Sequence, residues 1–193
     1  MGRPKKFETE DVLNSAMKVF WNKGFHPRSY EDLMMATGLN KQSIYHSFGD
    51  KRSLFIQTLE FNISKSLVTV EAALNKSKSP LKNIMDLCYF MVKTDLEIAP
   101  QSCYLVRCTM EFGEMDEDIL KILDKGYDDH EELFAVAVSK AQALGEITTV
   151  LSSKEVTKSL LNTWNGIRVQ QQRGGTEKEL KKIFDTSFKL FRA

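Results

Sequence analysis

Apolar residues recur at three- and four-residue spacings along almost the whole chain, and this spacing constrains the fold more than any other feature. The stretch 12–20 (V-L-N-S-A-M-K-V-F) shows the pattern, which is that of one face of a 3.6-residue helix. Similar stripes return as far as 180–191, whereas no segment alternates convincingly between apolar and polar residues. The short stretch 147–151 could be extended. We therefore expect an all-α protein of about nine helices.

The first 52 residues divide into short helices with marked ends. Thr9 stands at a cap position, and Gly24 stands where a first helix would stop. Gly38 suits the left-handed position after a second helix, Asn40 caps a third, and Asp50 caps a longer fourth. Because a four-residue turn containing glycine joins the second and third helices, the spacing predicts a helix-turn-helix unit.

The third helix of this unit carries polar and aromatic groups on the face turned away from its support. Its apolar residues, Ile44 and Phe48, would pack on the two preceding helices. The outward set consists of groups that reach phosphates and base edges in a major groove. These residues are Lys41, Gln42, Ser43, Tyr45 and His46. The alternative for them is an ordinary solvated helix face.

Composition limits the class of protein. The chain has 193 residues and a net charge of +1, but residues 1–52 hold nine basic and six acidic side chains, which favours a polyanion partner at that end. We find no apolar run long enough for a membrane span and no signal peptide. The three cysteines lack the spacing of a disulfide framework, so we expect a reducing, cytoplasmic setting.

Nothing in the sequence has the pattern of an enzyme site, a cofactor loop or a metal cluster. There is no glycine-rich phosphate loop, no H-E-x-x-H and no supported Ser/His/Asp set. Asp128, Asp129 and His130 are consecutive, so on a helix they diverge by about 100° each and do not converge on one ion. We expect no enzymatic activity, no cofactor and no metal.

Four motifs together resemble the TetR/AcrR family of bacterial transcriptional regulators. They are A-M-K-V-F-W-N-K-G-F, S-Y-E-D-L-M-M-A-T-G-L, N-K-Q-S-I-Y-H-S-F and G-D-K-R-S-L-F, within residues 7–55. The resemblance implies a homodimer whose N-terminal head (residues 1–52) binds palindromic double-stranded operator DNA. It also implies a helical body (residues 53–193) that binds an effector, after which the DNA is released.

Roles for single residues in the head follow from the resemblance where the motifs match. Lys41, Tyr45 and His46 are expected to face DNA, and Lys51 to hold a phosphate at the start of the fourth helix. Gln42 departs from the small residue of many relatives and can pair bidentately with adenine. Backbone contacts are expected from Ser29 and Thr37. Arg3 lies in a basic tail that either follows a minor groove or is a disordered arm aiding solubility.

The segment Q-S-C-Y-L-V-R-C-T-M-E-F resembles the corresponding part of a NemR-like subset that responds to electrophiles and oxidants. It places Cys103 on the cysteine of that subset. Near a helix start, with Arg107 one turn on, Cys103 would be stabilised as a thiolate. The alternative is a small buried hydrophobe at a helix contact. Cys88 lies in an apolar stripe and is expected in the core.

A non-covalent effector pocket and a dimer interface are also expected in the body. The bulky or polar candidates for the pocket are Phe90, Met91, Cys103, Tyr104, Arg107, Met110, Phe112, Phe134 and Trp164. The candidates for a twofold interface on the last two helices are Trp164, Ile167, Phe184, Phe188 and Phe191. For both sets the alternative is packing inside the chain's own core. The alternative function is a ligand-binding or protein-interaction module without specific DNA binding.

Overall fold

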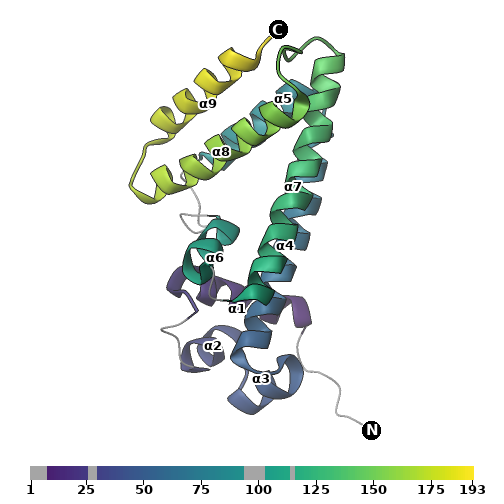
Figure 1. Cartoon of the computed structure of the whole chain (residues 1–193). Coiled ribbons are helices and arrows are strands. Elements are labelled where there is room, and N and C mark those ends of the chain that lie inside the picture. Colours follow the sequence, from purple (N-terminus) through teal and green to yellow (C-terminus); the bar gives the residue numbers. More distant parts are fainter. Residues whose placement is uncertain (1–7, 26–29, 94–102, 114–115) are drawn as a thin grey trace. The chain divides into compact units, whose positions relative to one another are not determined.

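The structure, a computed structural model, describes residues 8–25, 30–93, 103–113 and 116–193 (Figure 1). In these ranges the chain forms helices and no strand, which confirms the all-α prediction. The stretch 147–151 contributes one isolated bridge, between Ile147 and Arg192. The helices are α1 (Thr9–Lys23), α2 (Tyr30–Thr37), α3 (Lys41–Phe48), α4 (Lys51–Leu74), α5 (Pro80–Met91), α6 (Tyr104–Phe112), α7 (Glu117–Ala143), α8 (Ser153–Gln172) and α9 (Glu177–Phe191).

The chain forms two compact units, which we describe separately. The first unit takes Met1–Lys65 and Arg107–Leu123, and the second takes Ser66–Val106 and Asp124–Ala193. Helices α4 and α7 therefore each contribute to both units. Packing divides the chain after Lys65 because the first part of α4 belongs to the same core as α1–α3. The functional division into 1–52 and 53–193 stays a prediction.

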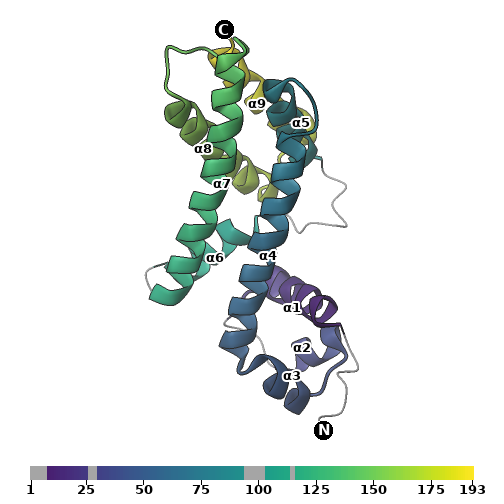
Figure 2. The same cartoon turned by 90° about the vertical axis from the view of Figure 1, so that its right-hand side faces the viewer.

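In the first unit, α1, α2 and α3 pack around the beginning of α4 (Figure 2). The buried side chains come from all four helices: Val12, Ala16, Phe20, Leu33, Ile44, Phe48, Leu54 and Phe55. Phe20 and Phe55 meet edge to face with ring centroids 5.2 Å apart. This arrangement buries Ile44 and Phe48, which lie about one turn apart on α3, and leaves the opposite face of that helix exposed to solvent.

The predicted helix ends in the head are largely confirmed. The Asn40 side chain accepts a hydrogen bond from the Ser43 amide at 2.8 Å, and Asp50 accepts one from the Ser53 amide at 2.7 Å. Gly38 has a φ of 69°, the left-handed conformation expected after α2. The cap expected at Thr9 is corrected: α1 begins at Thr9, and its N-cap is Glu8, which makes no side-chain cap hydrogen bond.

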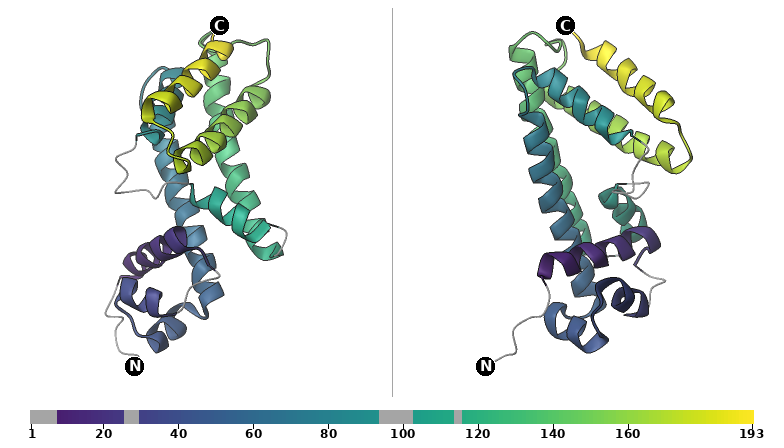
Figure 3. Two further views of the ribbon diagram at one scale, coloured as in Figure 1. Left: turned by 90° about the vertical axis from the view of Figure 1, so that its left-hand side faces the viewer. Right: turned by 180° about the vertical axis from the view of Figure 1, so that it is seen from behind.

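In the second unit, α9 packs on both α5 and α8 (Figures 1 and 3). The core also takes side chains from the parts of α4 and α7 that belong to this unit. Capping boxes open α8 and α9, where Ser152 pairs with Glu155 and Thr176 pairs with Glu179. These caps fix where the last two helices begin.

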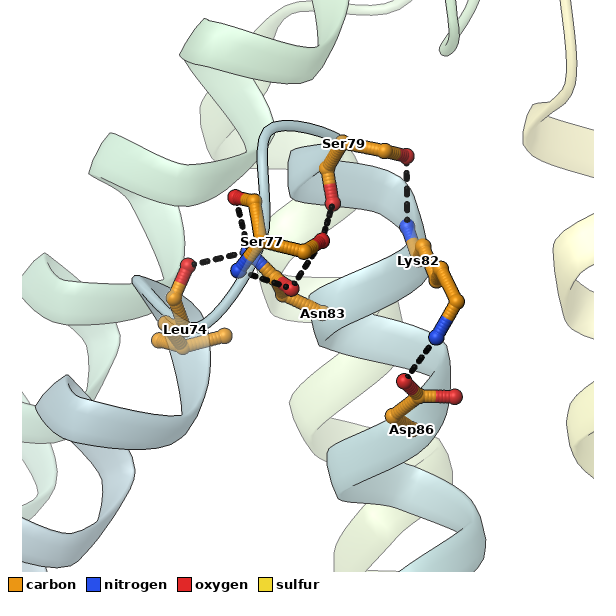
Figure 4. A network of polar contacts seen from close by, with 6 residues as sticks. All are labelled: Leu74, Ser77, Ser79, Lys82, Asn83 and Asp86. Carbon is orange, nitrogen blue, oxygen red and sulfur yellow. Dashed lines mark hydrogen bonds and ion pairs between the residues drawn. The ribbon is translucent and has the colours of Figure 1, made fainter.

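The turn between α4 and α5 is held by one buried amide side chain (Figure 4). Asn83 is 3% exposed. Its amide nitrogen donates to the carbonyls of Leu74 and Ser77 at 2.9 and 3.0 Å, and its oxygen accepts from the Ser77 amide and hydroxyl at 3.0 and 2.6 Å. The Ser79 side chain caps α5 by accepting from the Lys82 amide at 3.1 Å. Asn83, the fourth residue of α5, thus satisfies the end of the preceding helix.

Candidate functional site

Helix α3 has the two faces that the sequence predicted. Ile44 and Phe48 are buried, while Lys41, Gln42, Tyr45 and His46 are exposed, Tyr45 by 59%. The four exposed side chains line one shallow, open hollow on the surface. Ser43 is half-buried, and its amide is used by the Asn40 cap. The structure therefore brings together four of the five α3 residues selected from the sequence.

The ends of α3 are fastened by neighbouring side chains. Gln57 on α4 donates from its amide nitrogen to the Phe48 carbonyl at 2.8 Å, which satisfies the C-terminus of α3. The Thr37 hydroxyl donates to the Leu33 carbonyl at 2.7 Å and accepts from the Leu39 amide at 3.3 Å, so Thr37 shapes the turn before α3. The ammonium of Lys41 lies 4.9 Å from the ring centroid of Tyr30 on α2.

Lys51 has an intramolecular partner in this structure. Its ammonium donates to the Phe25 carbonyl at 2.8 Å and lies 4.9 Å from the centroid of the Phe25 ring. It thus ties the start of α4 to the second residue after α1. Contact of this ammonium with a DNA phosphate stays a prediction. The predicted contacts of Ser29 and Arg3 lie outside the described residues.

Two anchors within the first unit were not predicted from the sequence. The Phe25 amide donates to the Glu111 carboxylate of α6 at 2.6 Å, and the Phe25 ring packs against Phe112 with centroids 5.5 Å apart. Gly24 makes this approach possible, because a Cβ there would lie 2.8 Å from a Glu111 oxygen. The partners are 86 residues apart, so no local pattern could have indicated them.

The second anchor is an ion pair at the start of α4. Arg52 donates two hydrogen bonds to Asp116, at 3.0 and 2.7 Å, and one to Asp118 at 3.0 Å. The hydrogen bond from Arg52 lowers the pKa of Asp116, and the bonds to both carboxylates raise the pKa of Arg52. Both carboxylates lie at or just before the beginning of α7, so the pair holds that helix start against α4.

The residues proposed for an effector pocket do not form one group. Phe112 belongs to the first unit, where it packs on Phe25 and Phe55. Phe90 and Met110 are exposed. In the second unit, Phe134 is buried and meets Trp164 edge to face at 5.9 Å.

The remaining pocket candidates differ in how deeply they are buried, and they do not all belong to the same unit. Tyr104 is buried, and Met91 and Arg107 are half-buried. Among the described residues, the buried Nε atom of Arg107 has no hydrogen-bond partner. For the aromatic residues as a set, core packing describes the structure better than a shared cavity.

The three cysteines differ in environment. Cys88 and Cys108 are buried, and burial raises the pKa of the Cys88 thiol. Cys103 is half-buried. Burial lowers the pKa of Arg168 on α8, and Cys103 partly opposes that shift. No role was predicted for Arg168 from the sequence, and Arg107 was expected to stabilise the thiolate of Cys103. The position of Arg168 within the apolar stripe of a helix does not by itself indicate that its charged side chain is buried.

The residues proposed for a dimer interface are mostly in the core of their own chain. Ile167, Phe184, Phe188 and Phe191 are buried within the second unit, and only Trp164 of the set is half-buried. This corrects the expectation for the four buried residues, because a side chain already covered has no area left to bury against a second copy. The alternative given with that expectation, packing inside the chain, describes them.

The described residues do not form a site of another kind that the sequence could have suggested. Those residues contain no group of three His, Cys, Asp or Glu side chains placed to hold a metal ion. No helix among them is long and apolar enough to cross a membrane. The exposed face of α3 is therefore the best-formed candidate site in the described chain.

These features define a class of protein. A three-helix unit whose last helix presents lysine, glutamine, tyrosine and histidine to solvent, with its apolar side buried, is a helix-turn-helix DNA-binding head. The family model for bacterial regulatory proteins of the tetR family matches residues 12–58. Residues 12–58 therefore form a DNA-binding head of the tetR type, and the similarities support a DNA-binding transcriptional regulator like those of the TetR/AcrR family.

Known proteins resemble the chain beyond the head. The HTH-type transcriptional repressor ComR of Escherichia coli K12 is 26% identical over 98% of this chain and 91% of its own length. The uncharacterized HTH-type transcriptional regulator YezE of Bacillus subtilis is 28% identical over 76% of each. Both alignments extend well into the residues that follow the head.

Solved structures share the fold. The reduced form of E. coli NemR has a TM-score of 0.83 at 18% identity, covering 95% of this chain and 97% of that one. A cysteine mutant of the TetR family regulator CifR, complexed with 26-bp operator DNA, has a TM-score of 0.86 at 20% identity, covering 98% and 100%. At these identities the likeness concerns the fold alone.

Proposed function

We propose that the protein is a homodimeric repressor that binds a palindromic operator through α3 and leaves it when an effector binds the body. The observation that carries this function is the exposure of Lys41, Gln42, Tyr45 and His46 on a helix whose other face is buried. The curated relative ComR is named a repressor, and the CifR structure contains operator DNA. A twofold dimer requires a palindromic site with half-sites about one helical turn or more apart.

Contacts of different kinds are expected from the exposed side chains of α3. The Gln42 amide can form two hydrogen bonds with an adenine edge and is the proposed reader of sequence. Lys41, Tyr45 and His46 are proposed to contact phosphates, which set position and salt dependence but carry little sequence information. Changing Gln42 should therefore alter the preferred sequence, whereas changing Lys41 should weaken binding to every sequence.

The test begins with the DNA that the purified protein selects from a pool of genomic fragments. A band-shift titration of that DNA then compares the parent with a variant in which Lys41, Gln42 and Tyr45 are all alanine. Each good contact contributes about 1–3 kcal/mol, so the loss should reach about 100-fold in affinity or more. The matched control replaces two exposed lysines of the α4–α5 turn, Lys76 and Lys78, with alanine. Equal affinity of the folded triple variant and the parent would refute a role for α3.

Salt dependence separates this function from its alternatives. For a DNA reader the logarithm of the binding constant falls steeply and linearly with the logarithm of salt concentration, and Lys41→Ala should reduce the slope by about one. A helical interaction module, or an enzyme of this fold, would show weak binding without sequence preference. The family is one of regulators, and we propose that this protein has no catalytic activity and acts in the cytoplasm.

The dimer is proposed to form through the exposed faces of α8 and α9. Since the aromatic residues of these helices are buried, the contact must use residues such as Val169 and Ile183, which are 49% and 41% exposed, together with half-buried Trp164. Two helices from each chain would then form a four-helix bundle around the twofold axis.

The release step is proposed to act through α4, which contributes residues to both units. An effector that favours a conformation with the two copies of α3 differently spaced lowers DNA affinity. A difference of about 1–3 kcal/mol between the conformations suffices for a measurable effect.

Two kinds of effector are compatible with the body. One is a non-covalent ligand. The other is an electrophile or oxidant that reacts at Cys103, the least buried of the three cysteines. An electrophile would form a sulfur–carbon bond with the thiolate, and peroxide would convert it to sulfenic acid with loss of hydroxide. Operator release by oxidant that is unchanged in a Cys103→Ser protein would exclude the thiol route.

A further inference from the structure

Both backbone polar groups of Phe25 are bonded to side chains of other helices. Its amide donates to the Glu111 carboxylate of α6 at 2.6 Å, and its carbonyl accepts from the Lys51 ammonium of α4 at 2.8 Å. All three residues belong to the first unit. Glu111 is therefore connected to Lys51 through a single residue of the backbone, although the two side chains come from different helices.

The position of Phe25 is also fixed by its ring. The ring packs against three others of the first unit, which are Phe20, Phe55 and Phe112, with centroids 6.1, 5.2 and 5.5 Å away. Glu111 and Phe112 are neighbours on α6, and both contact Phe25. Because the ring and the amide are held at the same time, the Phe25 carbonyl has a defined place from which to accept the Lys51 ammonium.

Lys51 is the residue that gains from this arrangement. It begins α4 just after α3 ends, and its ammonium also lies 4.9 Å from the centroid of the Phe25 ring. A lysine side chain loses much rotamer freedom when its ammonium is fixed, and a group that is already fixed does not incur this cost on binding. An ammonium has three N–H donors, so a bond to a carbonyl is compatible with another to a phosphate.

We propose that Glu111 is a positioning residue for DNA binding, which acts through the Phe25 backbone to hold the Lys51 ammonium ready for a phosphate. This role rests on the proposed function and on the predicted contact between Lys51 and DNA. Its sign makes it distinctive. A carboxylate in a DNA-binding unit repels DNA by its charge, so its removal should strengthen binding if charge is its only effect. Loss of positioning should weaken binding instead.

The main test is a band-shift titration of the full-length protein with the DNA it selects. Glu111→Ala should bind that DNA about three- to tenfold more weakly than the parent. Glu111→Gln keeps an oxygen that can accept from the Phe25 amide and should retain most of the affinity. The matched control is Glu117→Ala, which removes an exposed carboxylate from the same unit and should not weaken binding. Undiminished affinity in folded Glu111→Ala, or an equal loss in Glu117→Ala, would overturn the role of Glu111.

A double-mutant cycle with Lys51→Met separates positioning from a structural effect. Lys51→Met alone should weaken binding and reduce the salt slope by about one. Glu111→Ala should shift the slope in the same direction. In the Lys51→Met background, Glu111→Ala should lower the affinity by less than about twofold, because the ammonium that it positions is already absent. A purely structural loss would lower the affinity by the same factor in both backgrounds, and that additive result would contradict the proposal.

Far-UV circular dichroism at the temperature of the band shift shows which variants are folded. If Glu111→Ala is not, Glu111→Asp takes its place, since its shorter side chain keeps the charge but withdraws the carboxylate from the Phe25 amide. The same loss and the same dependence on Lys51 are expected, and an affinity equal to that of the parent would overturn the proposal. Failure of the parent to bind DNA would refute the proposed function itself. A parent that binds DNA no better than Lys51→Met would refute the positioning role alone.

Discussion

The amide network at the α4–α5 turn gives the most direct prediction of stability. Asn83 is 3% exposed, and its side chain makes four hydrogen bonds to Leu74 and Ser77. Substitution by alanine removes all four. The Leu74 carbonyl, whose bond to Asn83 is buried, is then left without that partner at the end of α4. The groups of exposed Ser77 can instead bond to water.

The expected cost follows from this difference in exposure. A buried polar group left without its partner costs about 1–3 kcal/mol, and we take about 2 kcal/mol for the Leu74 carbonyl. The three bonds to Ser77 add about 0.3–0.5 kcal/mol each, because water replaces them. The total for Asn83→Ala is about 3 kcal/mol. For a chain of this length that corresponds to a lower Tm by about 6–12 °C.

A nearby surface pair supplies the control. Lys82 and Asp86 form an ion pair on α5, one turn apart, and both side chains are at least half exposed (Figure 4). Lys82→Ala should cost about 0.5 kcal/mol or less, as exposed pairs generally do. Thermal and urea unfolding of the parent and both variants, followed by far-UV circular dichroism, measures the two costs. Equal effects for the two substitutions would refute the reasoning that burial makes the Asn83 network important.

Three further predictions concern the first unit and the dimer. Gly24→Ala should destabilise the protein by about 1–3 kcal/mol, since Gly24 has a φ of 75° and a Cβ there would lie 2.8 Å from the Glu111 carboxylate. In a Glu111→Ala background the cost should be smaller, and an additive double-mutant cycle of unfolding would contradict the contact. Because the hydrogen bond from Arg52 lowers the pKa of Asp116, its stabilising contribution is complete above the unfolded-state pKa and is lost as pH falls through the lower folded-state value. Asp116→Asn should therefore flatten the acid limb of stability against pH, and an unchanged limb would exclude the pair as its cause. Ile183→Asp should weaken dimerisation at least tenfold in analytical ultracentrifugation, because a charge would enter an apolar contact; an unaltered dimer would place the interface elsewhere.

The head shows what can be predicted from local sequence. The Asn40 cap, the left-handed Gly38 and the burial of Ile44 and Phe48 were all predicted and are confirmed. Each depends on residues within about one helical turn of one another, where the chain itself fixes the geometry.

The body shows where prediction from sequence stops. A stripe containing Phe184 and Phe188 predicts a helix with one apolar face, but it is equally compatible with burial in the same chain and with burial against a second copy. In the structure, both residues are buried in the core of their own chain. Arg168 illustrates the same limit for a charge, since the sequence places it on α8 but does not indicate that it is buried.

The sequence by itself determined the helices, the caps of α3 and α4 and the polar face of α3, because hydrogen bonds between near neighbours and the 3.6-residue period are local properties of a chain. Only the tertiary structure decided that Glu111 holds the Phe25 amide, that Arg52 pairs with Asp116, and that Arg168 donates to the Met91 carbonyl. These contacts join residues tens of positions apart, and they exist because of where separate helices lie in space.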